Sequence, residues 1–299
     1  MFRNLRFYRI TSPWPSTEEK LSEVLSENAF SPCSPFSEKS AGWEAPGIVD
    51  QETLCRRLNG ADLIQLRTQS RVLPVAAIKE AMEDKINDYR SRMDQEPPRS
   101  ELRRLKEETR DELLPKALLK SERSRACFIL SESLLAIDVS TINKAEWFID
   151  QLRTCFGQFA CVPVTYNNAP GELMKRIFLG ESPLGFSLGR ECRMQDLTDS
   201  QAVATWRNIE LTDQAIRHHV IEGMKLTHLG VGFDELLTCV INEEAEISKL
   251  KFVEGENVDR PDTEDPQSRQ DADFVLLTGA VKRINEDLKK LLGGYAGTD

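Results

Sequence analysis

The spacing of hydrophobic residues changes several times along the first 72 residues, which predicts strands mixed with a short helix. Apolar and polar residues alternate over 2–10, and an apolar run covers 61–66, as in strands. Between them, Ser16-Thr17-Glu18-Glu19 has the form of a capping box that opens a helix. Prolines and glycines around Trp43 predict a loop-rich stretch.

From residue 73 the apolar residues follow a helical period. Apolar or aromatic side chains recur every three or four positions over 78–93, and a second stripe covers 102–113. Pro97-Pro98 separates the two, because proline lacks the backbone donor and clashes with the preceding turn. Pro115 ends or kinks the second helix. The pattern predicts a helical hairpin that projects from the body as an arm.

The rest of the chain again mixes the two patterns. Apolar runs at 127–130 and 134–139 predict a β-hairpin, followed by a helix that Thr141 or Asn143 caps and Gly157 ends, and by a strand at 161–164. We place a domain boundary at 167–171. Beyond it we expect strands at 186–193, 203–209, 225–231, 236–241 and 247–252, and helices at 173–179, 212–222 and 277–291.

These elements predict an α+β fold with antiparallel sheets and packed helices. The expected domains are a central α+β domain (1–74 plus 124–166), a helical arm or tip domain (75–123), and a base α+β domain with a C-terminal helix (167–299). Residues 254–273 are acidic and weakly apolar, so we expect a solvated loop there, with Asp271 as the cap of the last helix.

Composition narrows the class of protein. Of 299 residues, 40% are hydrophobic and 29% charged, and no apolar run approaches the length of a membrane span. Residues 1–6 lack the apolar run of a secretory signal, so we expect a cytoplasmic globular protein. The seven cysteines form no C-x-x-C pair, which favours reduced, buried thiols. With three histidines, a zinc site or a histidine-based triad is not expected.

The net charge of −10 by itself argues against a polyanionic partner, but the charge is unevenly distributed along the chain. Residues 241–273 hold 11 acidic and 4 basic side chains, whereas 116–125 hold four basic residues and one acid. On a continuing helix Lys116 and Lys120 would share a face, followed by Arg123 and Arg125, and such a face suits contact with phosphates. The alternative is a solvated face paired with Glu112 and Glu122.

Other chemistry has weaker support in the sequence. Gly230-Val231-Gly232 is too short for a nucleotide-binding loop. Asp138 lies near Glu146 and Asp150 in the sequence, and Asp271 near Asp273, and clustered carboxylates can hold Mg²⁺ in nucleases. At this acid content chance pairs are expected. A metal-dependent nuclease therefore stays an alternative, as does an acidic protein-interaction adaptor that acts through residues 254–273.

Four motifs, in order and with matching spacing, carry a resemblance to a known family. They are Ala29-Phe30-Ser31-Pro32-Cys33 with Gly42-Trp43 and Pro46; Leu73-Pro74 with Ile78-Lys79 and Lys85-Ile86; Leu113-Leu114-Pro115-Lys116-Ala117; and Asp271-Ala272-Asp273-Phe274 through Gly279. With these, the chain resembles the bacterial recombination-associated RdgC family over most of its length.

The resemblance implies a ring-shaped homodimer that encircles DNA. Such a ring would bind double- and single-stranded DNA with little sequence preference and restrain RecA-driven strand exchange, without enzymatic activity or a cofactor. The expected location is the cytoplasm, at the nucleoid. A closed ring also accommodates the net charge, because basic groups can line its inner wall while acids face outward.

The resemblance also indicates which residues contact DNA, and where this chain departs from the family. Leu118 stands where the family has an aromatic residue, and His228 where a lysine is common. The basic patch near Trp206 is thinner, and a strand tryptophan is more often buried than free to stack on bases. The predicted DNA-binding residues are Lys79, Lys116, Leu118, Lys120, Arg123, Arg125, Arg207 and Asn208.

Overall fold

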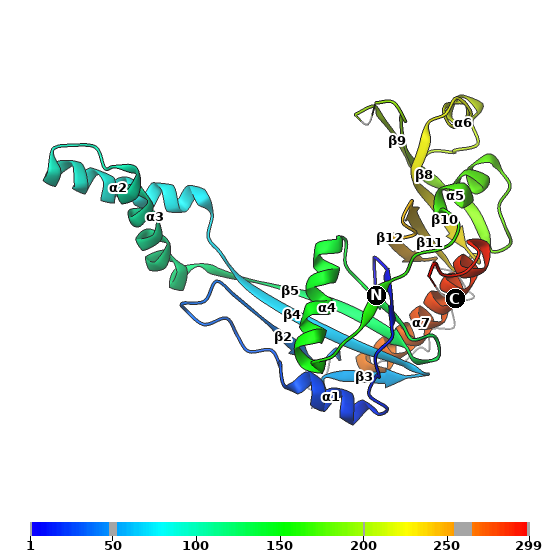
Figure 1. Cartoon of the computed structure of the whole chain (residues 1–299), viewed down its shortest axis with the longest axis horizontal. Helices are drawn as coiled ribbons and strands as arrows, with labels where there is room; N and C mark the ends of the chain where they lie inside the picture. The colour runs from blue at the N-terminus through cyan, green and yellow to red at the C-terminus, as the bar shows by residue number, and fades with distance from the viewer. Residues whose placement is uncertain (1, 48–52, 200, 254–264, 298–299) are drawn as a thin grey trace.

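The computed structural model describes residues 2–47, 53–199, 201–253 and 265–297. In these ranges the chain forms seven α-helices and two antiparallel sheets, which confirms the predicted α+β class (Figure 1). The helices are α1 (Glu18–Ser26), α2 (Val75–Met93), α3 (Arg99–Leu113), α4 (Ile142–Phe156), α5 (Pro170–Leu179), α6 (Gln214–Ile221) and α7 (Pro266–Leu291).

The first sheet has seven strands in the order β2-β4-β5-β6-β1-β7, with β3 also paired to β4. Its strands are β1 (Arg6–Ile10), β2 (Lys39–Glu44), β3 (Cys55–Leu58), β4 (Ala61–Val72), β5 (Leu118–Ile129), β6 (Leu134–Ile137) and β7 (Cys161–Pro163). β4 and β5 pair over their whole length, from Ala61 opposite Ile129 to Val72 opposite Leu118. This long pair carries the sheet outward to the first residues of α2 and the last of α3.

Strand alternation gives the seven-stranded sheet two different faces. Ile64 and Phe128 point to one face and pack in a core with residues of α1 and α4. Leu63 and Cys127 point to the other face and join a second core that includes α7. We call the first the α4 face and the second the α7 face. Each residue of β4 and β5 can be assigned to a face by counting in steps of two.

The second sheet has five strands in the order β12-β11-β10-β8-β9. These are β8 (Phe186–Gln195), β9 (Val203–Arg207), β10 (Lys225–Phe233), β11 (Leu237–Asn242) and β12 (Ile247–Phe252). Apolar residues from α5, α6 and α7 pack against one face of it in the same core that underlies the α7 face. The two sheets are also joined at their backbones, because Leu5 and Ile247 exchange hydrogen bonds of 2.8 and 3.1 Å.

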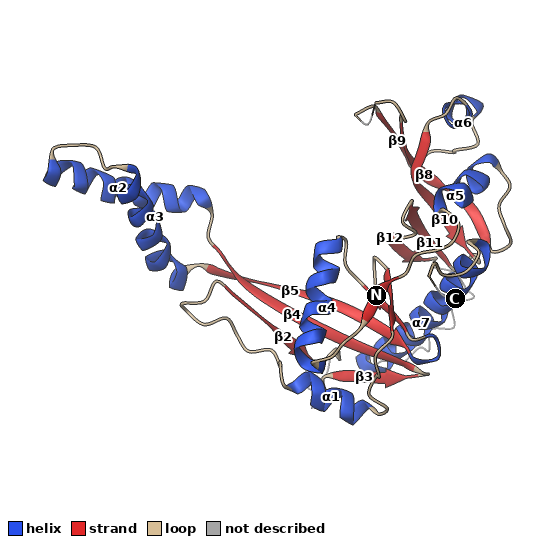
Figure 2. Ribbon diagram, in the orientation of Figure 1, coloured by secondary structure: helices blue, strands red, loops and turns tan. Residues whose placement is uncertain are grey.

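Helices α2 and α3 lie at the far end of β4 and β5, away from both cores (Figures 1 and 2). Both predicted helices are confirmed, although few side chains hold them together. Ile78 and Leu105 are buried, Thr109 is buried and bonds back to Leu105, and Lys85 pairs with Glu112 at 2.8 Å.

Three local predictions are wrong. Residues 118–125 do not continue the helix; they form β5, because there they pair with β4 residue by residue. Trp43 is not in a loop but on β2, and its ring is buried against Phe148 of α4. The last helix begins at Pro266, capped by Asp265, so Asp271 lies within it. The predicted solvated loop is therefore wrong for 266–273, and its part at 254–264 lies outside the described residues.

The cysteine prediction is confirmed: all seven are free thiols, six of them buried and Cys161 partly exposed. Burial raises the pKa of the thiols of Cys55 and Cys192 to about 12. Within the described residues, no helix combines the length and the apolar character that a bilayer crossing would need.

Candidate nucleic-acid interface

Four of the predicted DNA-binding residues lie on β5, and strand alternation divides them between the two faces of the sheet. Leu118 and Lys120 point to the α4 face, and Arg123 and Arg125 point to the α7 face. The helical face that the sequence suggested does not exist. The part of this strand pair that extends beyond the two cores, residues 67–72 with 118–124, is called the β4–β5 ribbon below.

On the α4 face, one carboxylate holds two lysines. Glu122 accepts Lys120 at 2.7 Å and Lys144 of α4 at 3.0 Å. These two hydrogen bonds lower the pKa of Glu122 to about 2, so it stays ionised at neutral pH. Nearby, Lys39 lies 4.0 Å from the centre of the Trp147 ring, a cation–π distance. The part of this face around Glu122 therefore has three lysines and one glutamate.

On the α7 face, the same arrangement is built from arginines. Glu44 of β2 accepts Arg123 at 3.0 Å and lies 3.6 Å from Arg67 of β4. Arg125, further along β5, is half-buried and donates to Gln65 at 2.6 Å. Burial is the largest influence on the pKa of Arg125 and lowers it. Of the two predicted arginines, Arg123 is the exposed one, and Arg125 lies at the edge of the core.

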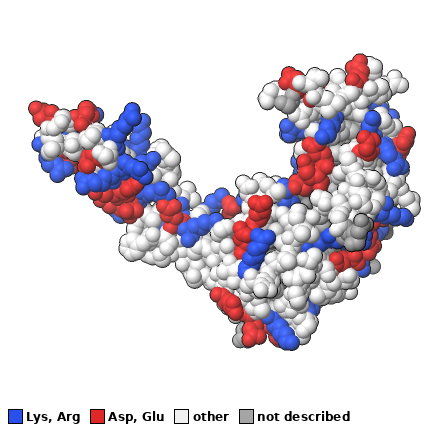
Figure 3. All heavy atoms as spheres, viewed as in Figure 1, with Lys and Arg blue, Asp and Glu red and all other residues white. Residues whose placement is uncertain are grey.

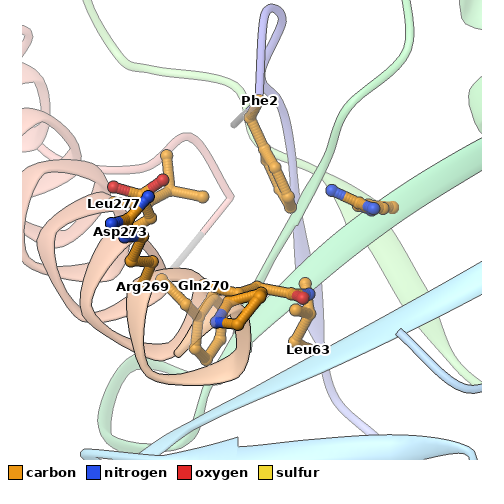
Figure 4. A pocket seen from close by; sticks show the side chains of 9 residues that line it. Phe2, Leu63, Arg269, Gln270, Asp273 and Leu277 are labelled. Atoms are coloured by element: carbon orange, nitrogen blue, oxygen red, sulfur yellow. The ribbon is translucent and has the colours of Figure 1, made fainter. Parts of the chain in front are cut away.

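Arg125 also reaches a cavity of about 320 Å³ between β4, β5 and the first turns of α7 (Figure 4). Phe2, Leu63 and Leu277 provide its apolar wall, and Arg269 and Asp273 add charge. Arg125 thus lines this cavity just beyond the ribbon, which further separates it from Lys120.

The other residues predicted near the arm are exposed. Lys79 on α2 and Lys116, just before β5, are both exposed, and neither forms an ion pair within the described residues. Leu118 follows on the same strand as Lys120 and is 79% exposed. An apolar side chain this accessible, with lysines on either side in the sequence, can contact a nucleic acid without rearrangement.

Arg207 and Asn208 lie on the other sheet and are not brought together with the β5 residues. Arg207 is exposed at the end of β9. Asn208 has a left-handed backbone (φ 59°), and its carbonyl accepts a hydrogen bond from Arg190. Trp206 is half-buried and its ring contacts that of His219, so it packs toward α6.

Sequence reasoning missed Arg67 and Lys144, which complete the two charge clusters, and Lys39, which stacks on Trp147 nearby. Nothing in their local sequence marks them, because each comes from a different element and only strand pairing and helix packing bring it to the ribbon. The acidic residues considered as metal ligands do not cluster either. Asp138 accepts the backbone N–H groups of Arg3 and Asn4, and Asp271 pairs with Arg56 at 2.6 Å. Among the described residues, no three histidine, cysteine or acidic side chains are placed to share a metal ion.

Fold and surface together define an α+β protein with cations clustered on both faces of its larger sheet. The chain belongs to the RdgC family: the family described as "Putative exonuclease, RdgC" matches residues 1–295. Among curated relatives it is 28% identical to the "Recombination-associated protein RdgC" of Tolumonas auensis, over 98% of both chains. Identity to the proteins of that name from Aeromonas hydrophila and Proteus mirabilis is 29% and 28%, covering 98% and 99% of each chain. The suspected family is confirmed.

Proposed function

We propose that this chain is a non-catalytic, sequence-independent DNA-binding protein that encircles DNA as a ring-shaped homodimer and restrains RecA-dependent recombination. The observation that carries the proposal is the pair of charge clusters on the β4–β5 ribbon. In each, one carboxylate holds two cations (Glu122 with Lys120 and Lys144, Glu44 with Arg67 and Arg123).

Such clusters suit a phosphate backbone. Each has one more cation than acid, and the acid holds the long side chains near one another before DNA arrives. Exposed ion pairs such as those of Glu122 with Lys120 and Lys144 are weak, on the order of 0–1 kcal/mol, so a phosphate can replace that carboxylate at little loss. In the other cluster Arg67 and Glu44 are mostly buried, so Arg123 is the cation there that a phosphate can reach. Contacts from lysine and arginine to phosphate oxygens carry no sequence information, which is why we expect little sequence preference.

The shape of the chain supports the ring. Figure 3 shows the surface hollowed between the α2–α3 pair and the five-stranded sheet, with the seven-stranded sheet between them. In this proposal residues 75–123 form the arm (tip) domain, 1–74 with 124–166 the central domain, and 167–299 the base. A second copy facing the hollow would close an opening around single- or double-stranded DNA. The chain would act in the cytoplasm, at the nucleoid, without a cofactor.

The test combines DNA affinity with molecular shape. Binding of two unrelated duplexes and one single strand is measured against salt concentration, and several phosphate contacts predict a linear fall of log K with log salt of about 0.9 per contact on duplex DNA. Small-angle scattering should show a hollow dimer. A salt-independent affinity, or a solitary chain at concentrations where DNA binds, would contradict the proposal.

The description of the matching family favours a second candidate, an exonuclease. End-labelled DNA incubated with the protein and Mg²⁺ distinguishes the two. Progressive shortening of the label that is lost in Asp138→Asn or Asp271→Asn would establish the nuclease. Intact DNA that stays bound supports the proposal above.

A further inference from the structure

The five-stranded sheet has a depression on the face that its helices leave uncovered. The cavity measures about 270 Å³ and is lined by Arg193, Arg207, Glu191 and Lys249, among others. Gly230 lies in the middle of the sheet between Val240 of β11 and Glu191 of β8, and a Cβ there would come within 3.1 Å of the Glu191 Cγ. The absence of a side chain at Gly230 therefore leaves room above the strands.

Strand register brings the charged residues to this depression. Glu191 on β8 is directly opposite Arg207 on β9, and Arg193 is opposite Thr205 on one side and His228 of β10 on the other. Directly paired residues of antiparallel strands have Cβ atoms about 5 Å apart. Glu191 and Arg207, which are 16 positions apart in the sequence, are thus neighbours on one face.

Lys249 reaches the depression through an unusual backbone. It lies where the pairing of β11 with β12 shifts, between Val240 opposite Ser248 and Thr238 opposite Lys251, and its φ is 52°. A bulge of this kind redirects a side chain, and a left-handed lysine is a strained conformation that the surrounding structure must hold. The Lys249 Nζ lies 2.8 and 2.7 Å from the two carboxylate oxygens of Glu191, although β10 and β11 separate their strands.

The charges do not balance. Arg193, Arg207 and Lys249 face a single carboxylate, Glu191, and neither arginine forms an ion pair within the described residues. Burial, and then the charge of Arg193, lower the pKa of His228, so its ring adds no charge at neutral pH. Two positive charges remain in a small depression, and the other acids that act on His228, Glu243 and Glu244, do not line the cavity.

We propose that this depression binds a phosphate group of the DNA backbone through Arg193 and Arg207, and that Glu191 weakens binding by holding Lys249 until the phosphate displaces it. The proposal rests on the DNA-binding function above, in which Arg207 is already a predicted contact; it adds Arg193 as a second ligand and the inhibition by Glu191 and Lys249. The strained backbone at Lys249 holds the lysine over the depression, where it can transfer from carboxylate to phosphate.

The experiment compares duplex affinity against salt for the full chain and three variants. Arg193→Ala with Arg207→Ala removes the phosphate ligands, and the slope of log K against log salt should become shallower by about 0.9, the value for one contact. Glu191→Gln removes the inhibiting carboxylate, so affinity should rise several-fold at low salt. Lys290→Ala, an exposed lysine on α7, removes one charge away from the depression and should leave both quantities unchanged.

The outcomes separate this site from the function it rests on. If the unmodified chain binds with a steep salt slope and the arginine variant keeps that slope, the site is refuted while DNA binding stands. If the unmodified chain does not bind DNA, both fail. Titrating inorganic phosphate into the protein without DNA tests whether the depression is instead a site for a free anion. If the arginine variant loses phosphate binding but keeps its affinity for DNA, the assignment to DNA is overturned. Circular dichroism confirms that each variant is folded.

Discussion

The double variant Lys116→Ala with Lys120→Ala tests the ribbon most directly. Both side chains are exposed at the start of β5, next to the exposed Leu118. Lys116 has no ion-pair partner in the described part of the chain, and Lys120 is held only by the exposed Glu122. Neither lysine supports the core, so we expect the free energy of unfolding to change by less than about 0.5 kcal/mol.

The expected effect on DNA binding follows from counterion release. Two lost phosphate contacts make the slope of log K against log salt shallower by about 1.8. Over a fourfold increase in salt, the unmodified chain should therefore lose about 12-fold more affinity than the variant. Lys144 stays paired with Glu122 in the variant, so part of the α4-face cluster persists and binding is weakened rather than abolished.

Fluorescence anisotropy with two duplexes of unrelated sequence, at four or more salt concentrations, measures both quantities. Lys290→Ala, which removes one exposed lysine away from the ribbon, is again the control for a general charge effect. The reasoning is refuted if the variant keeps the slope of the unmodified chain, because the two lysines then contact no phosphate. A loss confined to one duplex would also refute it, since that would show base readout.

Three further outcomes are expected. In the native chain the mostly buried Arg57 lies 2.5 Å from Asp62. Asp62→Ala removes this carboxylate and should lower the free energy of unfolding, measured in urea, by about 3–5 kcal/mol. Glu122→Gln should tighten DNA binding. Because the pKa of Glu122 in the folded chain is below its ordinary value of 4.5, its ion pairs stabilise the fold at pH values above 4.5. Any difference in melting temperature between the unmodified chain and the variant should therefore vanish as the pH falls to about 2. Titration with a thiol reagent at pH 8 should modify Cys161 first, and all seven cysteines only after unfolding; rapid reaction of several thiols in the native protein would contradict the observed burial.

Local patterns were sufficient to predict most of the elements. Hydrophobic periodicity and turn residues correctly predicted helices α2, α3, α4 and α7 and the β5–β6 hairpin. Each of these signals lies within a few residues of the element that it specifies. Two of the three errors have one cause. Residues 118–125 and Trp43 lie on strands because they pair with β4, a partner that is distant in the sequence for both.

The charge clusters depended entirely on tertiary structure. From the sequence, residues 116–125 could be identified as basic, and the resemblance named the family. The sequence did not show that alternation sends Lys120 and Arg123 to opposite faces, or that Glu44, 79 residues away from Arg123, holds it. Lys249 and Glu191 are 58 residues apart and meet because a bulge turns the lysine across β11 and β10, where Gly230 has no side chain. Ion pairs form between side chains that are close in space, and in a sheet that closeness is set by register, which no local stretch of sequence encodes.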